Sequence, residues 1–147
     1  MNCPTCAQKM VRKGHSHVTK VAGFTVTDGT GMVPVCEACG VRSLSVAELA
    51  GYERRAAWQI LTSSKIVSGE VLKFARKALG LRQKDFARLI GVGETHVSRL
   101  ENESEIDVQL RLAVAQLLDI AERHGLPSVE DVATHAEQSL EVQKRVA

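Results

Sequence analysis

The chain has 147 residues, of which 24% are charged and 3% are aromatic, and its formal net charge is +2. This length allows one ordinary domain or two small ones, and the low aromatic content requires an aliphatic core. No run of 18 apolar residues is present and the first ten residues lack the apolar stretch of a signal peptide, so we expect a cytoplasmic protein without a membrane span.

The charge is distributed unevenly along the chain. Residues 1–44 hold five Lys or Arg and two Asp or Glu, residues 65–102 hold eight and four, and residues 103–147 hold four and nine. The middle block is therefore the most basic and the last block is acidic. Because a basic block favours contact with phosphates, we expect residues 65–102 to face nucleic acid and the acidic block to face away from it.

Two C-x2-C pairs, separated by 29 residues, stand at the N-terminal end: Cys3 with Cys6, and Cys36 with Cys39. Each pair can direct two thiolates at one ion, and two pairs complete a tetrahedral shell of four sulfurs, which suits Zn2+. Cytoplasmic proteins use cysteines for metal more often than for disulfides. We therefore predict one structural zinc ion, with a redox dithiol pair or iron as the alternatives, and no open catalytic position at the metal.

The segment between the cysteine pairs is rich in Val, Thr and Phe, which favours strands. We expect three strands, at residues 15–21, 23–28 and 32–35, with turns at Lys13-Gly14 and Asp28-Gly29. The apolar residues here are too few for a substantial core, so metal binding has to supply much of the folding free energy of residues 1–43. His15 and His17 are alternative zinc ligands, but four cysteines suffice, and we expect both to be exposed strand residues.

Residues 44–64 have the pattern of a helical linker. Ser45 and Glu48 form a capping-box sequence, so a helix begins there and runs towards Ile60. The polar stretch at residues 62–64 is the expected hinge, and we expect the cysteine module to move relative to the helices that follow.

Residues 65–124 show helical periodicity of their apolar residues. Helices are expected at residues 68–79, 82–90, 94–102 and 107–124, with Leu112 among the buried positions of the last one. The second and third are joined by a tight break at residues 91–93. A helix, a short turn with glycine and a second helix make up the helix-turn-helix unit, whose second helix can lie in the major groove of DNA.

This stretch also resembles a known family. The order Gln83, Phe86-Ala87, Gly91-Val92, Val97-Ser98-Arg99 and Glu101 is similar to the Xre/Cro type of helix-turn-helix, over residues 68–123. Two positions depart from the family pattern. Gly93 stands where Ser or Thr often caps the recognition helix, and Glu103 stands where glycine is frequent. Neither departure removes a side chain that reads bases.

The recognition helix of this unit presents a set of polar side chains to DNA: Glu94, Thr95, His96, Ser98, Arg99 and Asn102. Arg99 can give a bidentate contact to guanine, and Thr95 can bond to a base edge or touch a thymine methyl group. Gln83 matches the family position that fixes the module on the phosphate backbone, and Lys84 is a further phosphate partner. A surface salt bridge of Arg99 with Glu101 or Glu94 is the alternative to base reading.

The last expected element is a helix within residues 125–147, which begins near Pro127 and Ser128. Its narrow apolar face can dock on its own domain or pair two chains. We favour a homodimer, because prokaryotic helix-turn-helix proteins usually read two half-sites through two-fold symmetry.

The arrangement as a whole resembles the MqsA-type antitoxins over residues 1–124: a Met-x-Cys-Pro-x-Cys start, a second C-x2-C, then an Xre-type unit. The resemblance implies a dimeric type II antitoxin that represses its operon at a palindromic operator in double-stranded DNA and neutralises a ribonuclease toxin through its zinc-bearing part. It also implies that the four cysteines bind zinc and that Thr95 and Arg99 read bases. Thr95 replaces an Asn of the best-known members, so the operator should differ.

We therefore predict an α+β fold: a β zinc-ribbon domain at 1–43, a helical linker at 44–64, an all-α λ-repressor-like domain at 65–124 and a C-terminal helix at 125–147. One alternative function is a stand-alone transcription regulator whose ribbon senses metal or redox state, or docks another protein. Another is a scaffold that binds only protein. No glycine-rich phosphate loop or nucleophile motif is present, so we expect no enzyme.

Overall fold

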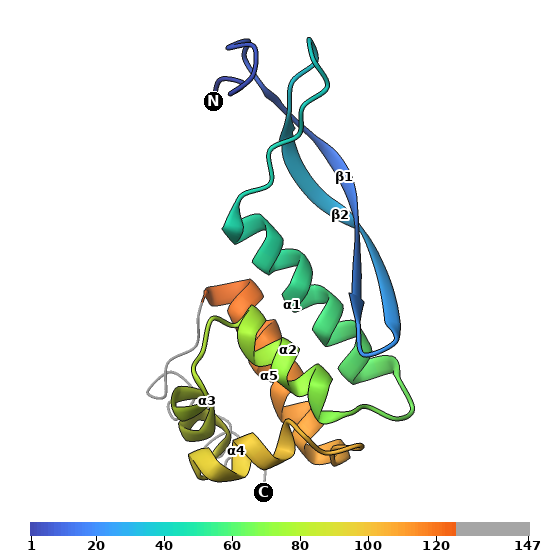
Figure 1. Cartoon of the computed structure of the whole chain (residues 1–147), viewed down its shortest axis with the longest axis vertical. Helices are drawn as coiled ribbons and strands as arrows, with labels where there is room; N and C mark the ends of the chain where they lie inside the picture. The colour runs from blue at the N-terminus through green and yellow to red at the C-terminus, as the bar shows by residue number, and fades with distance from the viewer. Residues whose placement is uncertain (126–147) are drawn as a thin grey trace, which may run out of the picture.

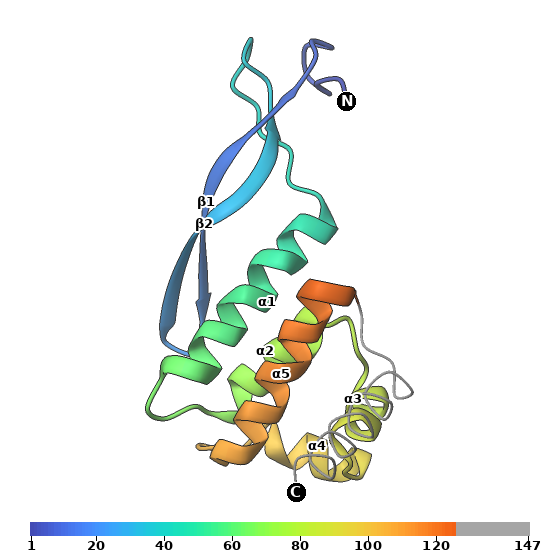
Figure 2. The same ribbon diagram turned by 180° about the vertical axis from the view of Figure 1, so that it is seen from behind.

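The computed structural model describes residues 1–125, so the helix expected within residues 125–147 lies outside the described residues. The elements are β1 (Val11–Val21), β2 (Phe24–Val35), α1 (Val46–Ser63), α2 (Gly69–Ala78), α3 (Gln83–Ile90), α4 (Glu94–Leu100) and α5 (Val108–His124). A long hairpin lies beside α1, and α2 to α5 gather on the other side of that helix (Figures 1 and 2). The predicted α+β class is confirmed. Among the helices of residues 1–125, none combines the length and apolar character that crossing a bilayer requires.

Strands β1 and β2 form one antiparallel hairpin, and its turn is at Ala22-Gly23, where both residues have positive φ. The predicted turns at Lys13-Gly14 and Asp28-Gly29 are wrong, because both glycines lie inside the strands. The pairing register of the two strands shifts between His15 and His17, which marks a β-bulge or irregularity in the hairpin. Glycine inside a strand often marks a bulge or a close approach of another group, and not only a turn.

A third strand glycine, Gly31, lies where Tyr52 of α1 approaches β2 closely. The Tyr52 side chain is 1% exposed and its hydroxyl donates a hydrogen bond to the carbonyl oxygen of His15 at 3.0 Å. A Cβ atom at Gly31 would lie 1.8 Å from the Tyr52 hydroxyl oxygen, so only glycine fits there. Val26 of β2 belongs to the same buried cluster as the helices. The loop end of the hairpin therefore shares its packing with the helical part of the chain.

Helix α1 begins as predicted, with a complete capping box between Ser45 and Glu48. The stretch expected to be a hinge, residues 62–64, is held by a buried arginine. The Arg111 guanidinium donates to the carbonyl oxygen of Leu61 at 2.8 and 3.1 Å, and also to the carbonyl oxygens of Ser64 and Lys65. Carbonyls at a helix C-terminus lack intrahelical partners, and a cation there is favourable. Arg111 therefore caps α1 and fixes the path towards α2.

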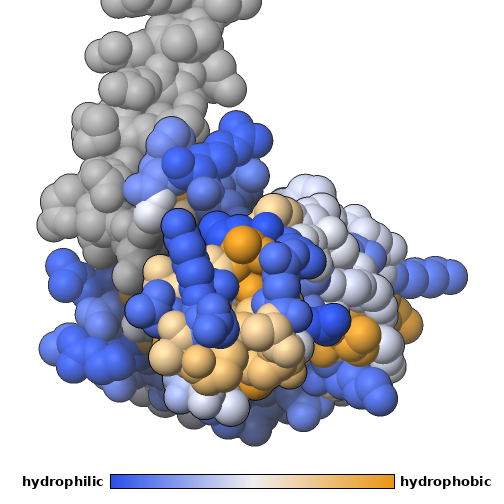
Figure 3. Space-filling model, turned by 90° about the horizontal axis from the view of Figure 1, so that it is seen from above, coloured by the Kyte–Doolittle hydropathy of each residue, from blue (hydrophilic) through white to orange (hydrophobic). Residues whose placement is uncertain are grey.

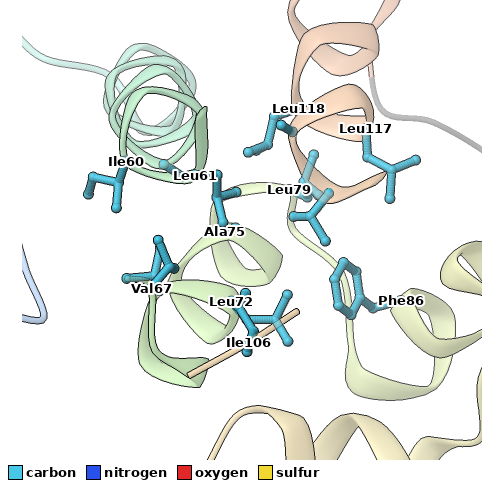
Figure 4. Close-up of a cluster of buried hydrophobic side chains, with 14 of the residues drawn as sticks. Ile60, Leu61, Val67, Leu72, Ala75, Leu79, Phe86, Ile106, Leu117 and Leu118 are labelled. Carbon is cyan, nitrogen blue, oxygen red and sulfur yellow. The ribbon is translucent and has the colours of Figure 1, made fainter. Parts of the chain in front are cut away.

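The core between the helices is aliphatic, as the composition requires. Its side chains are drawn in Figure 4, which labels Ile60, Leu61, Val67, Leu72, Ala75, Leu79, Phe86, Ile106, Leu117 and Leu118. Helix α5 contributes to it with one face only, because α1 and α2 cover that face. The expectation that Leu112 is buried is therefore wrong, and this side chain is 58% exposed.

Candidate metal centre and nucleic-acid interface

The two C-x2-C pairs fold into matching turns. Ala7 donates its N–H to the carbonyl oxygen of Cys3 at 2.9 Å, and Gly40 donates to that of Cys36 at 2.8 Å. Both donors are left-handed, with φ of 61° and 75°. The left-handed residue reverses the chain after each pair, so that the two thiols of a pair point the same way.

The four sulfur atoms converge on one point. All lie within 4.8 Å of one another, and three separations are 3.4 Å (Cys6 to Cys36), 3.5 Å (Cys3 to Cys39) and 3.6 Å (Cys6 to Cys39). A tetrahedral zinc ion with Zn–S bonds of about 2.3 Å requires sulfur separations of roughly 3.8 Å. The four cysteines therefore form a site that can hold one metal ion, and its all-thiolate donor set fits structural zinc.

The histidines considered as alternative ligands lie elsewhere. The rings of His15 and His17 lie against Tyr52, with centroids 6.1 and 4.8 Å from the tyrosine ring. Within residues 1–125, the cluster of potential metal ligands contains the four cysteines and no histidine.

The backbone around the sulfurs favours the thiolate form, which is the form that binds metal. Cys3 and Cys36 are buried, whereas Cys6 and Cys39 are exposed. Hydrogen bonds from the backbone amides of Cys6 and Thr5 lower the pKa of Cys3 to about 6, and the amide of Cys39 lowers the pKa of Cys36. The amides of Gln8 and Val41 act in the same direction on Cys6 and Cys39, but hydrogen bonds with the neighbouring thiols outweigh them and raise the pKa of these two cysteines.

The cysteine end has little apolar core of its own. Cys3, Met10 and Cys36 form a small buried cluster, with Val41 packed against it. Seen from this end, hydrophobic atoms gather at the tip and hydrophilic side chains surround them (Figure 3). Met1 is 71% exposed, and Ala7 and Ala38 are exposed as well. The metal site thus lies just beneath a partly apolar surface.

At the opposite end of the molecule, α3 and α4 form the predicted helix-turn-helix (Figure 1). Gly91 ends α3 with φ of 75°, and Val92 donates its N–H to the carbonyl oxygen of Ala87 at 2.9 Å. Phe86 and Val97 are completely buried between the two helices and α2. The unit is therefore a packed part of the helical core and presents its outer face to solvent.

The side chains predicted to face DNA are exposed, with one exception. The exposed ones are Lys84 on α3, Glu94, Thr95, His96, Ser98 and Arg99 on α4, and Asn102, which lies beyond the end of α4. The side-chain amide of Asn102 donates to the carbonyl oxygen of Ser98 at 2.8 Å, so it caps the helix. Gln83 is half-buried at the start of α3. Their role in DNA binding remains a prediction.

A buried ion pair joins α2 to the helix-turn-helix formed by α3 and α4. The Arg76 Nε atom lies 2.5 Å from the Glu101 Oε1 atom, and their side chains are 10% and 3% exposed. The Gln83 amide donates to Glu101 Oε2 at 2.9 Å. Because Glu101 is turned inward, the salt bridge considered between Arg99 and Glu101 does not form. Among residues 1–125, no carboxylate lies within ion-pair distance of Arg99.

Sequence reasoning missed Arg76. The one available signal was its position four residues after Leu72, on the apolar face of α2, where a charged residue needs a buried partner.

A family model described as the antitoxin component of a bacterial toxin-antitoxin system, MqsA, matches residues 1–130. The match includes both cysteine pairs and the whole helix-turn-helix. A comparison with curated proteins finds no match.

Proposed function

The chain belongs to the MqsA antitoxin family, and from this we propose that it neutralises a ribonuclease toxin and represses the operon that encodes the pair. The observation that carries the proposal is that two chemically different exposed surfaces lie at opposite ends of one packed molecule (Figures 1 and 2). One surface covers the four-cysteine site, and the other is the outer face of the helix-turn-helix. We propose that both surfaces act by binding.

The charge and exposure of α4 support DNA binding. Arg99 is exposed and has no ion-pair partner within residues 1–125, so its guanidinium is available for a guanine edge. Residues 65–102 carry a net charge of +4, and the buried pair of Arg76 and Glu101 removes one charge of each sign, which leaves this surplus to the other side chains. The Gln83 amide uses one N–H for Glu101, which orients the second N–H for a phosphate oxygen. We propose that a homodimer reads a palindromic operator in this way.

The surface at the cysteine end supports protein binding. Its exposed apolar side chains, Met1, Ala7 and Ala38, are surrounded by hydrophilic ones, which is the usual composition of a protein-binding patch. Zinc would hold Cys3, Cys6, Cys36 and Cys39 together and thereby keep this patch in shape. Because the patch and α4 lie at opposite ends, we propose that toxin and DNA bind to the antitoxin independently.

Arg99→Ala tests the DNA half of the proposal. We expect it to weaken binding to the chain's own promoter by about 1–3 kcal/mol and to flatten sequence preference, because Arg99 loses a base contact. Fluorescence anisotropy with promoter and scrambled duplexes measures both effects. Lys20→Ala is the matched control, since it removes one exposed positive charge from β1 at the other side of the molecule. Equal losses on both duplexes would contradict base reading.

Purification of the tagged chain from its native host, with identification of the proteins that co-purify, tests the proposal that it neutralises a toxin. The tagged chain should co-purify with a small protein encoded beside it, which stops growth when expressed alone and not when expressed with the chain. Recovery of promoter DNA without such a partner would contradict the toxin proposal and favour a stand-alone regulator.

One observation favours a redox-sensing role if the chain is a stand-alone regulator. Cys6 and Cys39 are exposed, and their sulfurs are 3.6 Å apart. Peroxide can take two electrons from this thiolate pair and two protons from the solvent, which gives a disulfide and two water molecules and leaves the metal ion without two of its four ligands. A regulator of this kind would lose zinc and promoter affinity together in mild peroxide. Retention of zinc under these conditions would exclude it.

A further inference from the structure

A polar hollow opens beside the recognition helix, where the start of α2, the start of α3 and the segment after α4 meet. Polar and charged side chains line it, among them Gln83, Ser98 and Asn102. These three residues belong to the set predicted to face DNA. The hollow therefore lies on the side of the helix-turn-helix that the proposed function places against the duplex.

The hollow is acidic, although the block of chain that contains the helix-turn-helix is the most basic of the protein. Lys73 is the positive side chain of its lining, and Glu70 and Glu103 are two exposed negative ones. Glu101 lines it as well, but Arg76 balances its charge. One positive and two negative side chains leave the lining with a net charge of −1.

The two exposed carboxylates differ in what they do for the fold. Glu70 lies in the first turn of α2, where a negative charge is favourable to the helix dipole. Within residues 1–125, no Lys, Arg or His lies within ion-pair distance of Glu103. Glu103 is also one of the two departures from the Xre/Cro pattern, at a position where glycine is frequent. The fold therefore does not explain an acidic side chain here.

The backbone holds Glu103 at the edge of the hollow. Gly69, the first residue of α2, donates its N–H to the carbonyl oxygen of Glu103 at 2.9 Å, and Glu103 donates its own N–H to the carbonyl oxygen of Leu100 at 3.2 Å. A Cβ atom at Gly69 would lie 1.9 Å from the Leu100 oxygen, so the start of α2 is in close contact with the end of α4. The Glu103 carboxylate thus extends from a fixed point beside the hollow that Gln83 also lines.

We propose that Glu103 weakens contact with the DNA backbone and thereby sets how tightly the protein holds DNA. This rests on the proposed function, in which the Gln83 amide binds a phosphate oxygen at the same hollow. A carboxylate about 8 Å from a phosphate weakens binding about twofold in water, and more where the surroundings are less polar. Binding to non-specific DNA depends on phosphate contacts alone. Glu103 therefore makes stable binding depend on base contacts such as that of Arg99.

Anisotropy titrations of the full-length protein, with its promoter duplex and with a scrambled duplex, test this proposal. Glu103→Gln removes the charge and keeps the backbone hydrogen bonds, so both duplexes should bind about twofold tighter or more, and Glu103→Lys should add a further gain. The gain should shrink as the salt concentration rises from about 0.05 to 0.3 M, because ions screen the repulsion. Glu103→Asp keeps the charge and should bind as the natural protein does. Circular dichroism should be the same for all variants.

Glu105→Gln is the matched control. Glu105 is exposed, lies two residues further along the chain and does not line the hollow. Its substitution changes the net charge of the protein by the same amount, so a clearly smaller gain in affinity is expected. The comparison separates the local effect of Glu103 from that of total charge.

The outcomes distinguish this proposal from the proposed function. Promoter binding by the natural protein with unchanged affinity in Glu103→Gln, or with an equal gain in Glu105→Gln, overturns the role of Glu103 and keeps the DNA-binding function. A gain on the promoter alone also overturns it, because the effect would then depend on base sequence. Absence of promoter binding by the natural protein at low salt rejects the DNA-binding function and the role of Glu103 with it.

Discussion

The two ends of this molecule are stabilised by different interactions, metal binding at one end and apolar packing at the other. At the cysteine end, the buried cluster consists of Cys3, Met10 and Cys36, two of which are metal ligands. At the helical end, a continuous aliphatic core joins α1, α2, α3, α4 and α5. The hairpin lies between them. Its loop end packs on the helical core, although the hairpin as a whole stands between the two cysteine pairs in the sequence. A position between two metal-binding pairs in the sequence therefore does not mean that the metal stabilises the whole segment.

The largest expected effect is that of metal loss at the cysteine end. Cys36→Ser, or removal of zinc by a chelator, should unfold residues 1–10 and 36–43, because metal binding in small zinc domains supplies about 10–16 kcal/mol. Metal analysis should fall from one zinc per chain to none, and hydrogen exchange should become fast in these residues only. The helical signal in circular dichroism should persist.

The matched control is a substitution in the helical core, at the other end of the molecule. Phe86→Ala removes a completely buried ring from the helical core and should lower the free energy of unfolding by about 3–5 kcal/mol. This variant should keep its zinc. Melting of the helices in Cys36→Ser, or zinc loss in folded Phe86→Ala, would show that the two ends do not fold independently.

A smaller effect is expected where the hairpin meets α1. Arg55 of α1 donates to Asp28 of β2 at 2.5 Å. Burial opposes the ionisation of Asp28, but hydrogen bonds from Thr30 and Arg55 outweigh it, so the pKa of this carboxyl is lowered. A carboxyl with a lowered pKa stabilises the fold above its unfolded value of about 4, and this contribution is lost as the pH falls through the lower folded value.

Asp28→Asn measures this contribution. At pH 7 the natural protein should be more stable than the variant by about 1–2 kcal/mol. The difference should shrink as the pH falls below about 4 and should disappear below the lowered pKa of Asp28. Urea unfolding across this range checks it, and zinc loss at low pH affects both proteins alike. Asp119→Asn breaks an exposed pair within α5, whose side chains are 43% and 70% exposed, and should change stability by less than about 0.5 kcal/mol. A difference for Asp28→Asn that does not vary with pH would contradict the ion pair.

The smallest effect is expected in the two cysteine turns. Ala7 and Gly40 occupy the same left-handed position, where a Cβ atom costs about 1 kcal/mol. Ala7→Gly should therefore stabilise the zinc-bound end slightly, and Gly40→Ala should destabilise it by a similar amount. Competition with a chromophoric chelator measures the zinc affinity of both. We expect zinc affinity to rise in Ala7→Gly and to fall in Gly40→Ala. A change in the same direction in both variants would show that the two turns are not equivalent.

Signals between residues close in sequence predicted the cysteine cluster and the helix boundaries well. The zinc ligands follow from the spacing of four cysteines, and the start of α1 follows from Ser45 and Glu48, because a turn or a cap involves residues close in sequence. The ends of α3 and α4 agree with prediction within two residues, because Gly91 and the helical period mark them. The exposure of Thr95 and Arg99 on α4 follows from the same period.

Contacts between distant residues were not predictable in this way. Tyr52 reaches the hairpin at Gly31, Arg111 holds the supposed hinge, and Arg76 neutralises Glu101 inside the helix-turn-helix. The sequence by itself determined the two cysteine pairs, the helices and the helix-turn-helix, since each pair, helix and turn depends on residues close to one another in the chain. Tertiary structure decided which polar residues became buried partners and which face of α5 was left uncovered, because burial depends on segments that only the folded chain brings together.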